Sequence, residues 1–416
     1  MKHSAVQRGA GVVKHSPVCA GQRSGVKCQA WARLRYSFGV RALIGSYSIP
    51  SLWTGTPLGH GAGIVGVTGT ATASAGPSTG ATPSMGSGTE FTLAATHVWA
   101  ENETNPSFLA LAADGAVWAI TEPERGGELL RFAPGREGWP STTAPARIAT
   151  GADAPCHLAL GTGTGGPGSS AAPAVVFVSH YHGGVVTAIV CGAAGDPERV
   201  AETITLPDHG IGWDRSGSRS RPHSVLVLPG GEHFLVADCG RDLVALYAWD
   251  QSAETADLLD VLVLASGTGP RHLTRRAASE TIYVSNQERG GVSVVTLEAR
   301  RLRLRATVPG PGLGRERPVP SEIALHPDNA SLVLANRVDD SLTVYAIAAD
   351  GSLAERATVD SCGMNPRHFA FTPDGAALLV AHQDSDELVA FGWEGGLPVD
   401  PIRIPISTPT AVLFLR

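Results

Sequence analysis

Short apolar runs separated by turn residues occupy most of this chain, and one arrangement of them occurs seven times. In each copy a proline precedes an apolar run, a turn follows, and a second apolar run ends on polar residues. The prolines are spaced by 49, 67, 48, 50, 46 and 43 residues, and they are Pro106, Pro155, Pro222, Pro270, Pro320, Pro366 and Pro409. A repeat of this length, built from short strands, predicts the blades of a β-propeller.

The seventh copy predicts how the ring closes. It ends after its first strand, TAVLFLR, so the remaining strands of that blade must come from elsewhere. Residues 41–48 read as the second strand of this blade, and residues 61–67 read as the third. Joining both ends of the chain in one sheet removes the free edges of an open array. We therefore expect an all-β, seven-bladed propeller over residues 41–416.

Two segments of low complexity interrupt the pattern. Residues 68–89 and 161–172 are rich in Gly, Ser, Thr and Pro, and we expect both to be loops. Residues 1–41 carry eight basic side chains, and no acidic residue precedes Glu90. We interpret residues 1–40 as a disordered leader or as the product of a start codon assigned too far upstream. A mitochondrial transit peptide is the alternative.

Charge and composition exclude several classes of function. Removing the eight basic residues leaves 24 basic against 38 acidic residues, a net charge near −14, which argues against nucleic acid as a partner. No stretch of about 18 apolar residues predicts a membrane-spanning helix. The six cysteines show no CxxC pair, which favours free thiols and a cytoplasmic location. A closed ring needs no second chain, so we expect a monomer.

Two positions keep a constant relation to the repeated proline, and both carry polar side chains. The first and second residues after it include His157, His223, Arg271, His272, Glu322, Arg367 and His368. The position 17 residues after it holds Cys239, Gln287, Arg337 and Gln383, with Glu122 and Tyr181 as the shifted equivalents. Equivalent positions of successive blades form rings around the central channel. Arginine suits a carboxylate or a phosphate because its planar fork donates two parallel hydrogen bonds.

Structural and functional readings compete at these positions. His, Asp and Arg side chains also lock neighbouring blades together, and Asp238 and Asp242 suit that role. Three guanidinium groups near one axis repel each other unless an anion joins them, which favours a binding site. His180 and His182 resemble a metal pair without a third ligand, so no metal site is predicted. No serine-hydrolase, Walker or dinucleotide motif is present.

From about Ala42 onward the chain resembles the lactonase family of seven-bladed propellers, which includes 6-phosphogluconolactonases and carboxymuconate cyclases. The resemblance is carried by NPSFLAL, PCHLAL, PHSV, DCGRD, GPRH, SEI, NR and NPRHF with AHQDSD, in this order. It implies a lactone-processing enzyme that needs no metal or organic cofactor and acts on a small anionic lactone. It also implies site residues at His223, Arg271, Gln287 and Arg337.

Two departures from the family pattern concern the proton acceptor. The family's Asn-Glu is Asn286-Gln287 here, and Gln cannot accept a proton. The family's His-x-His is Arg221-Pro222-His223. The base is then expected to be Glu288, Glu322 or His223. Our expected catalytic set is His223, Arg271, Gln287, Glu322 and Arg337, and the expected substrate-binding set is His157, His272, Arg367 and Gln383.

Three functions remain in competition. The favoured one is hydrolysis of 6-phosphogluconolactone to 6-phosphogluconate, a step of the pentose phosphate pathway. The second is a carboxymuconate-type enzyme that forms or opens a lactone of an aromatic-derived dicarboxylate. The third is a propeller that binds a ligand without catalysis, which Gln287 in place of an acid would favour.

Overall fold

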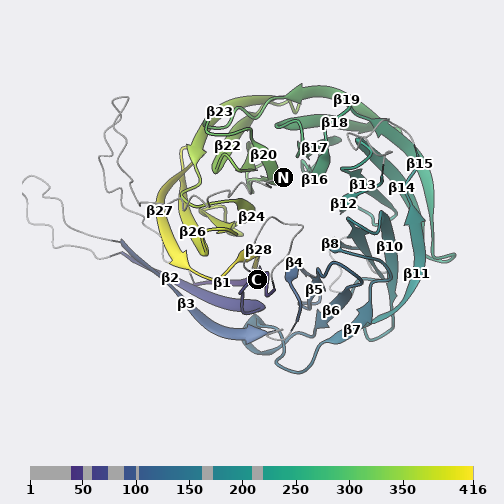
Figure 1. Cartoon of the computed structure of the whole chain (residues 1–416), viewed down its shortest axis with the longest axis horizontal. Helices are drawn as coiled ribbons and strands as arrows, with labels where there is room; N and C mark the ends of the chain where they lie inside the picture. The colour runs from purple at the N-terminus through teal and green to yellow at the C-terminus, as the bar shows by residue number, and fades with distance from the viewer. Residues whose placement is uncertain are drawn as a thin grey trace, which may run out of the picture. The chain divides into compact units, whose positions relative to one another are not determined.

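The computed structural model describes residues 39–49, 59–73, 89–99, 103–161, 172–208 and 219–415. All of them belong to one compact unit, Arg33–Arg416. They form seven four-stranded antiparallel sheets around a common centre (Figure 1). The predicted seven-bladed β-propeller is therefore confirmed. The predicted leader lies outside the described residues, apart from residues 39 and 40, which begin the first strand.

Six blades each use four consecutive strands, the first nearest the centre and the last outermost (Figure 1). We number them 1 to 6 in chain order. Blade 1 contains β4 (Pro106–Leu111), β5 (Val117–Thr121), β6 (Glu128–Phe132) and β7 (Ala146–Ala149), with a 3-10 turn η1 (Arg136–Gly138) between the last two. Blade 2 contains β8 (Pro155–Leu160), β9 (Val175–His180), β10 (Val185–Cys191) and β11 (Pro197–Thr205). Blade 3 contains β12 (Pro222–Val227), β13 (His233–Asp238), β14 (Leu243–Asp250) and β15 (Thr255–Val263).

The second half of the ring repeats this order. Blade 4 contains β16 (Pro270–Arg275), β17 (Thr281–Asn286), β18 (Val292–Glu298) and β19 (Arg301–Val308). Blade 5 contains β20 (Val319–Leu325), β21 (Ser331–Arg337), β22 (Ser341–Ile347) and β23 (Leu353–Asp360). Blade 6 contains β24 (Pro366–Phe371), β25 (Ala377–His382), β26 (Glu387–Glu394) and β27 (Leu397–Pro405).

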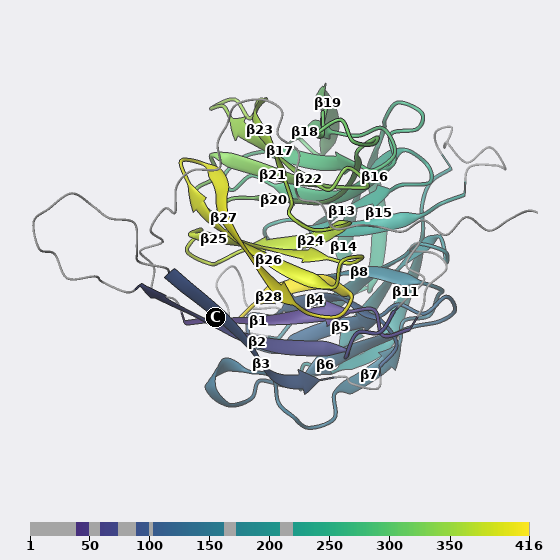
Figure 2. The ribbon, with the colours of Figure 1, turned by 60° about the vertical axis from the view of Figure 1, so that its left-hand side comes forward.

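Blade 7 joins the two ends of the described chain, as predicted. Its order is β28 (Pro409–Phe414), β1 (Gly39–Ser46), β2 (Ile64–Ala73) and β3 (Thr89–Trp99). Figure 2 shows these strands side by side. The register of β1 against β28 pairs Leu43 with Leu413 and Ile44 with Val412. The seventh sheet thus obtains the strands that the last repeat lacks.

The first predicted loop is shorter than expected. Strand β2 continues to Ala73, and β3 begins at Thr89 and pairs with it there. Residues 68–73 read TGTATA, and this alternation of β-branched threonine with small residues suits a paired strand better than the composition of the whole segment indicated. Residues 74–88 lie outside the described residues. The second insert lies between β8 and β9, as predicted, and its residues 162–171 are likewise not described.

The repeated proline begins the innermost strand of a blade and is followed by a shift in pairing. Each of the seven first strands starts at this proline, except β20, which starts one residue earlier. Proline lacks an N–H group, so the first residue of a strand is where it costs least. In every blade the register of the first strand against the second shifts within three residues of it. Such a bulge changes the direction in which the following side chains point.

The core consists of the apolar layers between neighbouring blades. Phe177 of blade 2 stacks on Phe234 of blade 3 with ring centroids 4.2 Å apart, and both are fully buried. Strand β1 is buried on both faces: Leu43 packs with Leu109 of blade 1, while Ile44 packs with Leu388 of blade 6. The strand that closes the ring is therefore part of two apolar layers.

Leu43→Ala tests the closing blade. Leu43 is completely buried in β1, so the cavity left by truncation is expected to lower the free energy of unfolding by about 2–5 kcal/mol. Urea unfolding followed by tryptophan fluorescence measures the change. The control is Val263→Ala at a side chain that is 46% exposed, where a change within about 0.5 kcal/mol is expected. Equal effects of the two variants would contradict the packing described for β1.

Candidate active site

The residue after the second strand of each blade occupies an equivalent place around the centre. These residues are Tyr47, Glu122, Tyr181, Cys239, Gln287, Arg337 and Gln383, with Arg337 itself the last residue of β21. In six of them the backbone N–H donates to the carbonyl of the residue before the repeated proline. Arg337 is paired in register with the corresponding residue, Val319. The ring of strand ends expected from the sequence is therefore present.

Tyr47 is the member of this ring that the sequence analysis missed. It follows Ser46, the last residue of β1, and its N–H donates to the carbonyl of Thr408 at 3.1 Å. The signal was present, because residues 41–48 had been read as the second strand of the closing blade. In blade 7 the repeated proline, Pro409, lies near the C-terminus, whereas Tyr47 lies near the N-terminus. The spacing of 17 residues after the proline therefore could not be used to find Tyr47.

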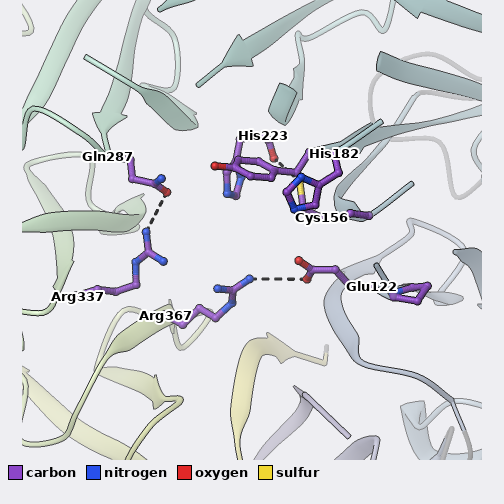
Figure 3. A pocket seen from close by; sticks show the side chains of 10 residues that line it. Glu122, Cys156, His182, His223, Gln287, Arg337 and Arg367 are labelled. Atoms are coloured by element: carbon purple, nitrogen blue, oxygen red, sulfur yellow. Dashed lines mark hydrogen bonds and ion pairs between the residues drawn. The ribbon is translucent and has the colours of Figure 1, made fainter. Parts of the chain in front are cut away.

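A cavity of about 110 Å³ opens where these strand ends meet the starts of the innermost strands. Figure 3 shows its labelled side chains converging on a central space. Of the residues expected at the site, His223, Gln287, Arg337 and Arg367 line it. The rest of the lining is Glu122, Pro123, Ala154, Cys156, Tyr181 and His182. Glu122 is the one Asp or Glu in this lining.

Two arginines of the lining have polar partners across the cavity wall. Arg337 donates from Nη2 to Oε1 of Gln287 at 2.9 Å. Arg367 approaches Oε2 of Glu122 with its Nη2 at 3.7 Å, and its guanidinium lies over the ring of Tyr47, 5.0 Å from the centroid. Figure 3 marks both polar contacts. One of these two cations therefore faces a neutral amide, and its charge is not balanced by that partner.

Arg271 is the most unusual of the three cations. It is 2% exposed, and its Nε and Nη1 are buried without a hydrogen-bond partner among the residues that the structure describes. Burial, followed by repulsion from Arg337 and Arg367, lowers its pKa. Burial and repulsion from Arg367 lower the pKa of Arg337 in the same way. Burying a cation whose nitrogens lack hydrogen-bond partners is costly, and an anion bound beside it would remove much of that cost.

His223, one of the two histidines in the lining, remains neutral at pH 7. Burial and the positive charge of Arg271 hold the pKa of His223 well below 6.5. Its Nδ1 is buried without a hydrogen-bond partner in the described part of the chain. The thiol of Cys156 also lines the cavity, but burial raises its pKa, so it stays protonated. Neither group supplies an anion to balance the arginines.

Gln287 is held in one orientation by its neighbours. Its Oε1 accepts the hydrogen bond from Arg337, and its Nε2 donates to Oε1 of Glu288 at 2.9 Å. Glu288 itself is not part of the cavity lining and also lies 3.8 Å from Nη2 of Arg317. The amide thus places an acceptor toward Arg337 without adding a negative charge to the cavity.

A second layer of polar side chains lies one residue farther along the innermost strands. Glu322 is its centre: its Oε2 is 2.9 Å from Nδ1 of His272 and 3.2 Å from Nε2 of His368. His157 packs on Phe108 with ring centroids 4.2 Å apart and on His272 at 5.3 Å. Glu322, His157 and His272 interact electrostatically with Arg271, but they do not line the cavity.

The remaining residues singled out from the sequence lie elsewhere. Gln383 is buried and donates from Nε2 to Oδ1 of Asp384 at 3.1 Å, outside the cavity lining. His180 and His182, which resemble a metal pair in the sequence, do not share a strand, because β9 ends at His180. His180 contacts Oγ1 of Thr187 at 3.0 Å, whereas His182 lines the cavity. Asp238 accepts backbone N–H groups of its own turn, including that of Gly240, as expected for a structural residue.

Three further observations concern the described residues. No group of three or more His, Cys, Asp and Glu side chains among them is arranged to hold a metal ion. In the part of the chain that the structure describes, no helix is long and apolar enough to span a membrane. The four described cysteines, Cys156, Cys191, Cys239 and Cys362, are all free thiols.

Fold and cavity together define a propeller with a cationic site at the centre of its ring, and comparison with known proteins identifies its family. The family model described as "Lactonase, 7-bladed beta-propeller" matches residues 68–414. The chain belongs to this family of lactonase propellers.

Individual relatives are distant. The uncharacterized protein YwcC of Lactococcus lactis is 25% identical over 294 residues, which are 69% of this chain and 80% of the relative. A 6-phosphogluconolactonase of Formosa agariphila is 24% identical over 220 residues, 51% of this chain and 62% of the relative. The solved structure of the periplasmic gluconolactonase PpgL of Pseudomonas aeruginosa has a TM-score of 0.71 at 22% identity, covering 91% of this chain and 99% of that one. This last likeness concerns the fold.

Arg271→Met is expected to make the protein more stable in the absence of an anion. The folded state disfavours the charged guanidinium, so the charge lowers the free energy of unfolding wherever Arg271 is protonated. Replacing it by an apolar chain of similar length is expected to raise that free energy by about 1–4 kcal/mol in a buffer without phosphate or carboxylate. Urea unfolding measures the change, with exposed Arg303→Met as the control. A marked loss of stability would assign Arg271 a structural role instead.

His368→Gln is expected to reduce the acid sensitivity of folding. Burial is the main reason that the pKa of His368 falls to about 4, below the 6.5 of the unfolded chain. The unfolded state then binds a proton that the folded state does not, and stability decreases as the pH falls below about 6.5. Removing this group should reduce the slope of unfolding free energy against pH by up to about 1.4 kcal/mol per unit between pH 6 and 4.5. An unchanged slope in urea titrations would contradict this.

Proposed function

We propose that this protein hydrolyses a small lactone that carries an anionic group, with 6-phosphogluconolactone as the first candidate. The observation that carries the proposal is the presence of Arg337 and Arg367 in the lining of one cavity that contains a single carboxylate, with the buried Arg271 outside the lining but near enough to repel both. Like charges so close together in a buried place repel each other, and this arrangement is favourable when a bound anion offsets the repulsion.

The arginines are suited to two tasks in such a reaction. A guanidinium group binds a phosphate or carboxylate through parallel N–H groups, which would anchor the substrate away from its lactone ring. A second guanidinium can donate to the carbonyl oxygen of the lactone and stabilise the negative charge that develops there when water attacks. Stabilising a developing oxyanion with donors already in place is commonly the largest contribution to such catalysis. Arg337 and Arg367 line the cavity for these tasks, and Arg271 adds its charge beside them.

The similarity to known lactonases supports this proposal without deciding the substrate. The family is named for lactonase activity, and a relative at 24% identity is named 6-phosphogluconolactonase. A cationic cavity would also accept a dicarboxylate lactone of the muconate type. What favours the phosphorylated substrate is the neutral partner of Arg337: Gln287 leaves that charge available, and a phosphate dianion offers the larger countercharge.

Three of the remaining expected residues take supporting roles in this proposal. Gln287 orients Arg337 by accepting its hydrogen bond. The carboxylate of Glu322 contacts the imidazoles of both His272 and His368. The negative charge of Glu322 would partly balance Arg271 and fix the imidazoles in place. His223 faces the substrate as a neutral ring. We also propose a reducing, cytoplasmic location and a monomer, in keeping with the free thiols of the four described cysteines and with the closed ring.

A lactone-opening assay tests the proposed activity. Freshly generated 6-phosphogluconolactone is given to the full-length protein, and ring opening is followed by proton release against the spontaneous rate. The wild-type protein is expected to exceed that rate clearly. Arg337→Met and Arg271→Ala, which remove preorganised donors or their charge, are expected to lower kcat/KM by about 10²–10³-fold. Gluconolactone without the phosphate should be a poorer substrate, mainly through a higher KM.

The control for this assay is Arg303→Met, at an exposed position of β19 far from the cavity lining. It is expected to keep the wild-type kcat/KM. A wild-type rate equal to the spontaneous one with both lactones would contradict the proposed hydrolysis. If calorimetry then still detected binding of 6-phosphogluconate, the propeller would be a binding protein.

A further inference from the structure

The proposed hydrolysis needs a proton acceptor, and the cavity contains a carboxylate that the sequence analysis did not assign to that role. Glu122 follows the last residue of β5, and its backbone N–H donates to the carbonyl of Asn105 at 3.0 Å. Its side chain reaches into the cavity opposite Gln287 and Arg337 (Figure 3). An acid is therefore present in the site, on the wall across from the position where Gln287 stands.

One oxygen of this carboxylate is fixed by its neighbours. Oε2 of Glu122 accepts a hydrogen bond from the hydroxyl of Tyr47 at 3.0 Å and lies 3.7 Å from Nη2 of Arg367. Tyr47 is completely buried, and burial raises the pKa of its hydroxyl well above 10, so the hydroxyl stays protonated and acts as the donor. These contacts hold the carboxylate in one orientation.

The backbone around this contact is also tightly defined. Asn105 precedes the repeated proline of blade 1 and adopts a left-handed backbone conformation with φ of 49°, which asparagine tolerates better than most residues. Its Oδ1 accepts the N–H groups of Ser48 and Ile49, which follow Tyr47, at 2.8 and 3.0 Å. Its Nδ2 donates to the carbonyl of Glu122 at 3.3 Å. Asn105 thus ties the segment of Tyr47 to the segment of Glu122.

The other oxygen is available to a ligand. No hydrogen bond or ion pair joins Oε1 of Glu122 to any residue that the structure describes. A carboxylate that is oriented through one oxygen and open at the other is the arrangement that a general base requires. A water molecule next to Oε1 would lie in the same cavity as the arginines that bind the lactone.

The other acceptors expected from the sequence are less suited to the task. Oε2 of Glu322 contacts the imidazoles of His272 and His368, and Glu322 does not line the cavity. Glu288 also lies outside the lining. His223 does line the cavity, but its strongly lowered pKa makes its imidazole a weak proton acceptor. Glu122 combines a position in the cavity lining with a carboxylate that is oriented through Oε2.

We propose that Glu122 is the general base of the reaction and that Tyr47 is the residue that positions it. This inference rests on the lactone hydrolysis proposed above and assigns its proton transfer. Oε1 of Glu122 takes a proton from water while the water oxygen forms a bond to the lactone carbonyl carbon. The carbonyl oxygen becomes an oxyanion beside the arginines.

The second half of the reaction returns the enzyme to its starting state. The oxyanion reforms the carbonyl, and the bond between the carbonyl carbon and the ring oxygen breaks. The ring oxygen takes the proton back from Glu122 and becomes the hydroxyl of the product. The new carboxylic acid releases its own proton to solvent, so the overall reaction consumes one water molecule and needs no further reactant.

The decisive experiment compares Glu122→Gln with the wild-type protein in the lactone-opening assay. Loss of the base is expected to lower kcat by about 10²–10⁴-fold. Binding of 6-phosphogluconate, measured by calorimetry, is expected to be kept or strengthened, because the variant removes a negative charge beside Arg367. The matched control is Glu128→Gln in the same blade, where the carboxylate pairs with Arg147 at 3.1 Å outside the cavity, and it should leave kcat unchanged.

Two further variants separate a chemical role from a structural one. Glu122→Asp keeps a carboxylate and should recover part of the rate that Glu122→Gln loses. Tyr47→Phe removes one hydrogen bond to the base and should lower kcat by about 2–10-fold while KM stays near the wild-type value. A general loss of structure would change KM and product binding as well.

The outcomes distinguish this inference from the proposed function. If the wild-type protein opens the lactone and Glu122→Gln keeps most of the wild-type kcat, Glu122 is not the base, and the hydrolase proposal stands. If the wild-type protein does not exceed the spontaneous rate, the proposed function fails, and the role of Glu122 fails with it. Loss of kcat with product binding retained, and partial recovery in Glu122→Asp, would support the inference.

Discussion

The pairing of β1 with β28 is the interaction on which the rest of this molecule depends. It places a strand from the beginning of the described chain between β28 and β2 and so completes the seventh blade. Because β1 is buried on both faces, its side chains complete the apolar layers of blades 1 and 6 at once. The same pairing puts Tyr47 against Glu122, a contact between residues 75 positions apart in the sequence. Closure of the ring and construction of the site are thus one event.

The centre of the ring combines charges that a stable core would avoid. Two nitrogens of the buried Arg271 have no hydrogen-bond partner within the described part of the chain, and its charge repels two neighbouring guanidinium groups. Apolar layers between the blades supply the stability that tolerates this arrangement. An unliganded protein that carries such strain gains affinity for an anion, since binding relieves repulsion as well as forming new contacts. In this propeller, stability and affinity therefore make opposite demands on the same arginines.

The distribution of acid and amide around the cavity changes how the family resemblance is understood. Gln287 occupies the position where an acid was expected, and on the sequence alone this raised the prospect of a propeller without catalysis. In the structure an acid, Glu122, stands on the opposite wall with one oxygen oriented by Tyr47. A cavity lined by strand ends from all directions can hold the same chemical group at more than one blade. For this reason, losing an acid at one position does not by itself remove the chemistry from the site.

The sequence by itself determined the blade repeat, the number of blades, the closure by both chain ends and the two rings of polar positions. These follow from local rules: alternation makes strands, turn residues separate them, and a constant spacing from the proline returns equivalent residues to equivalent places. Only the tertiary structure decided which members of the rings share the cavity: His223 and Arg367 line it, whereas Arg271, His157 and Glu322 do not. It also decided the orientation of Glu122, since that depends on Tyr47, a residue brought near by ring closure and not by any spacing along the chain.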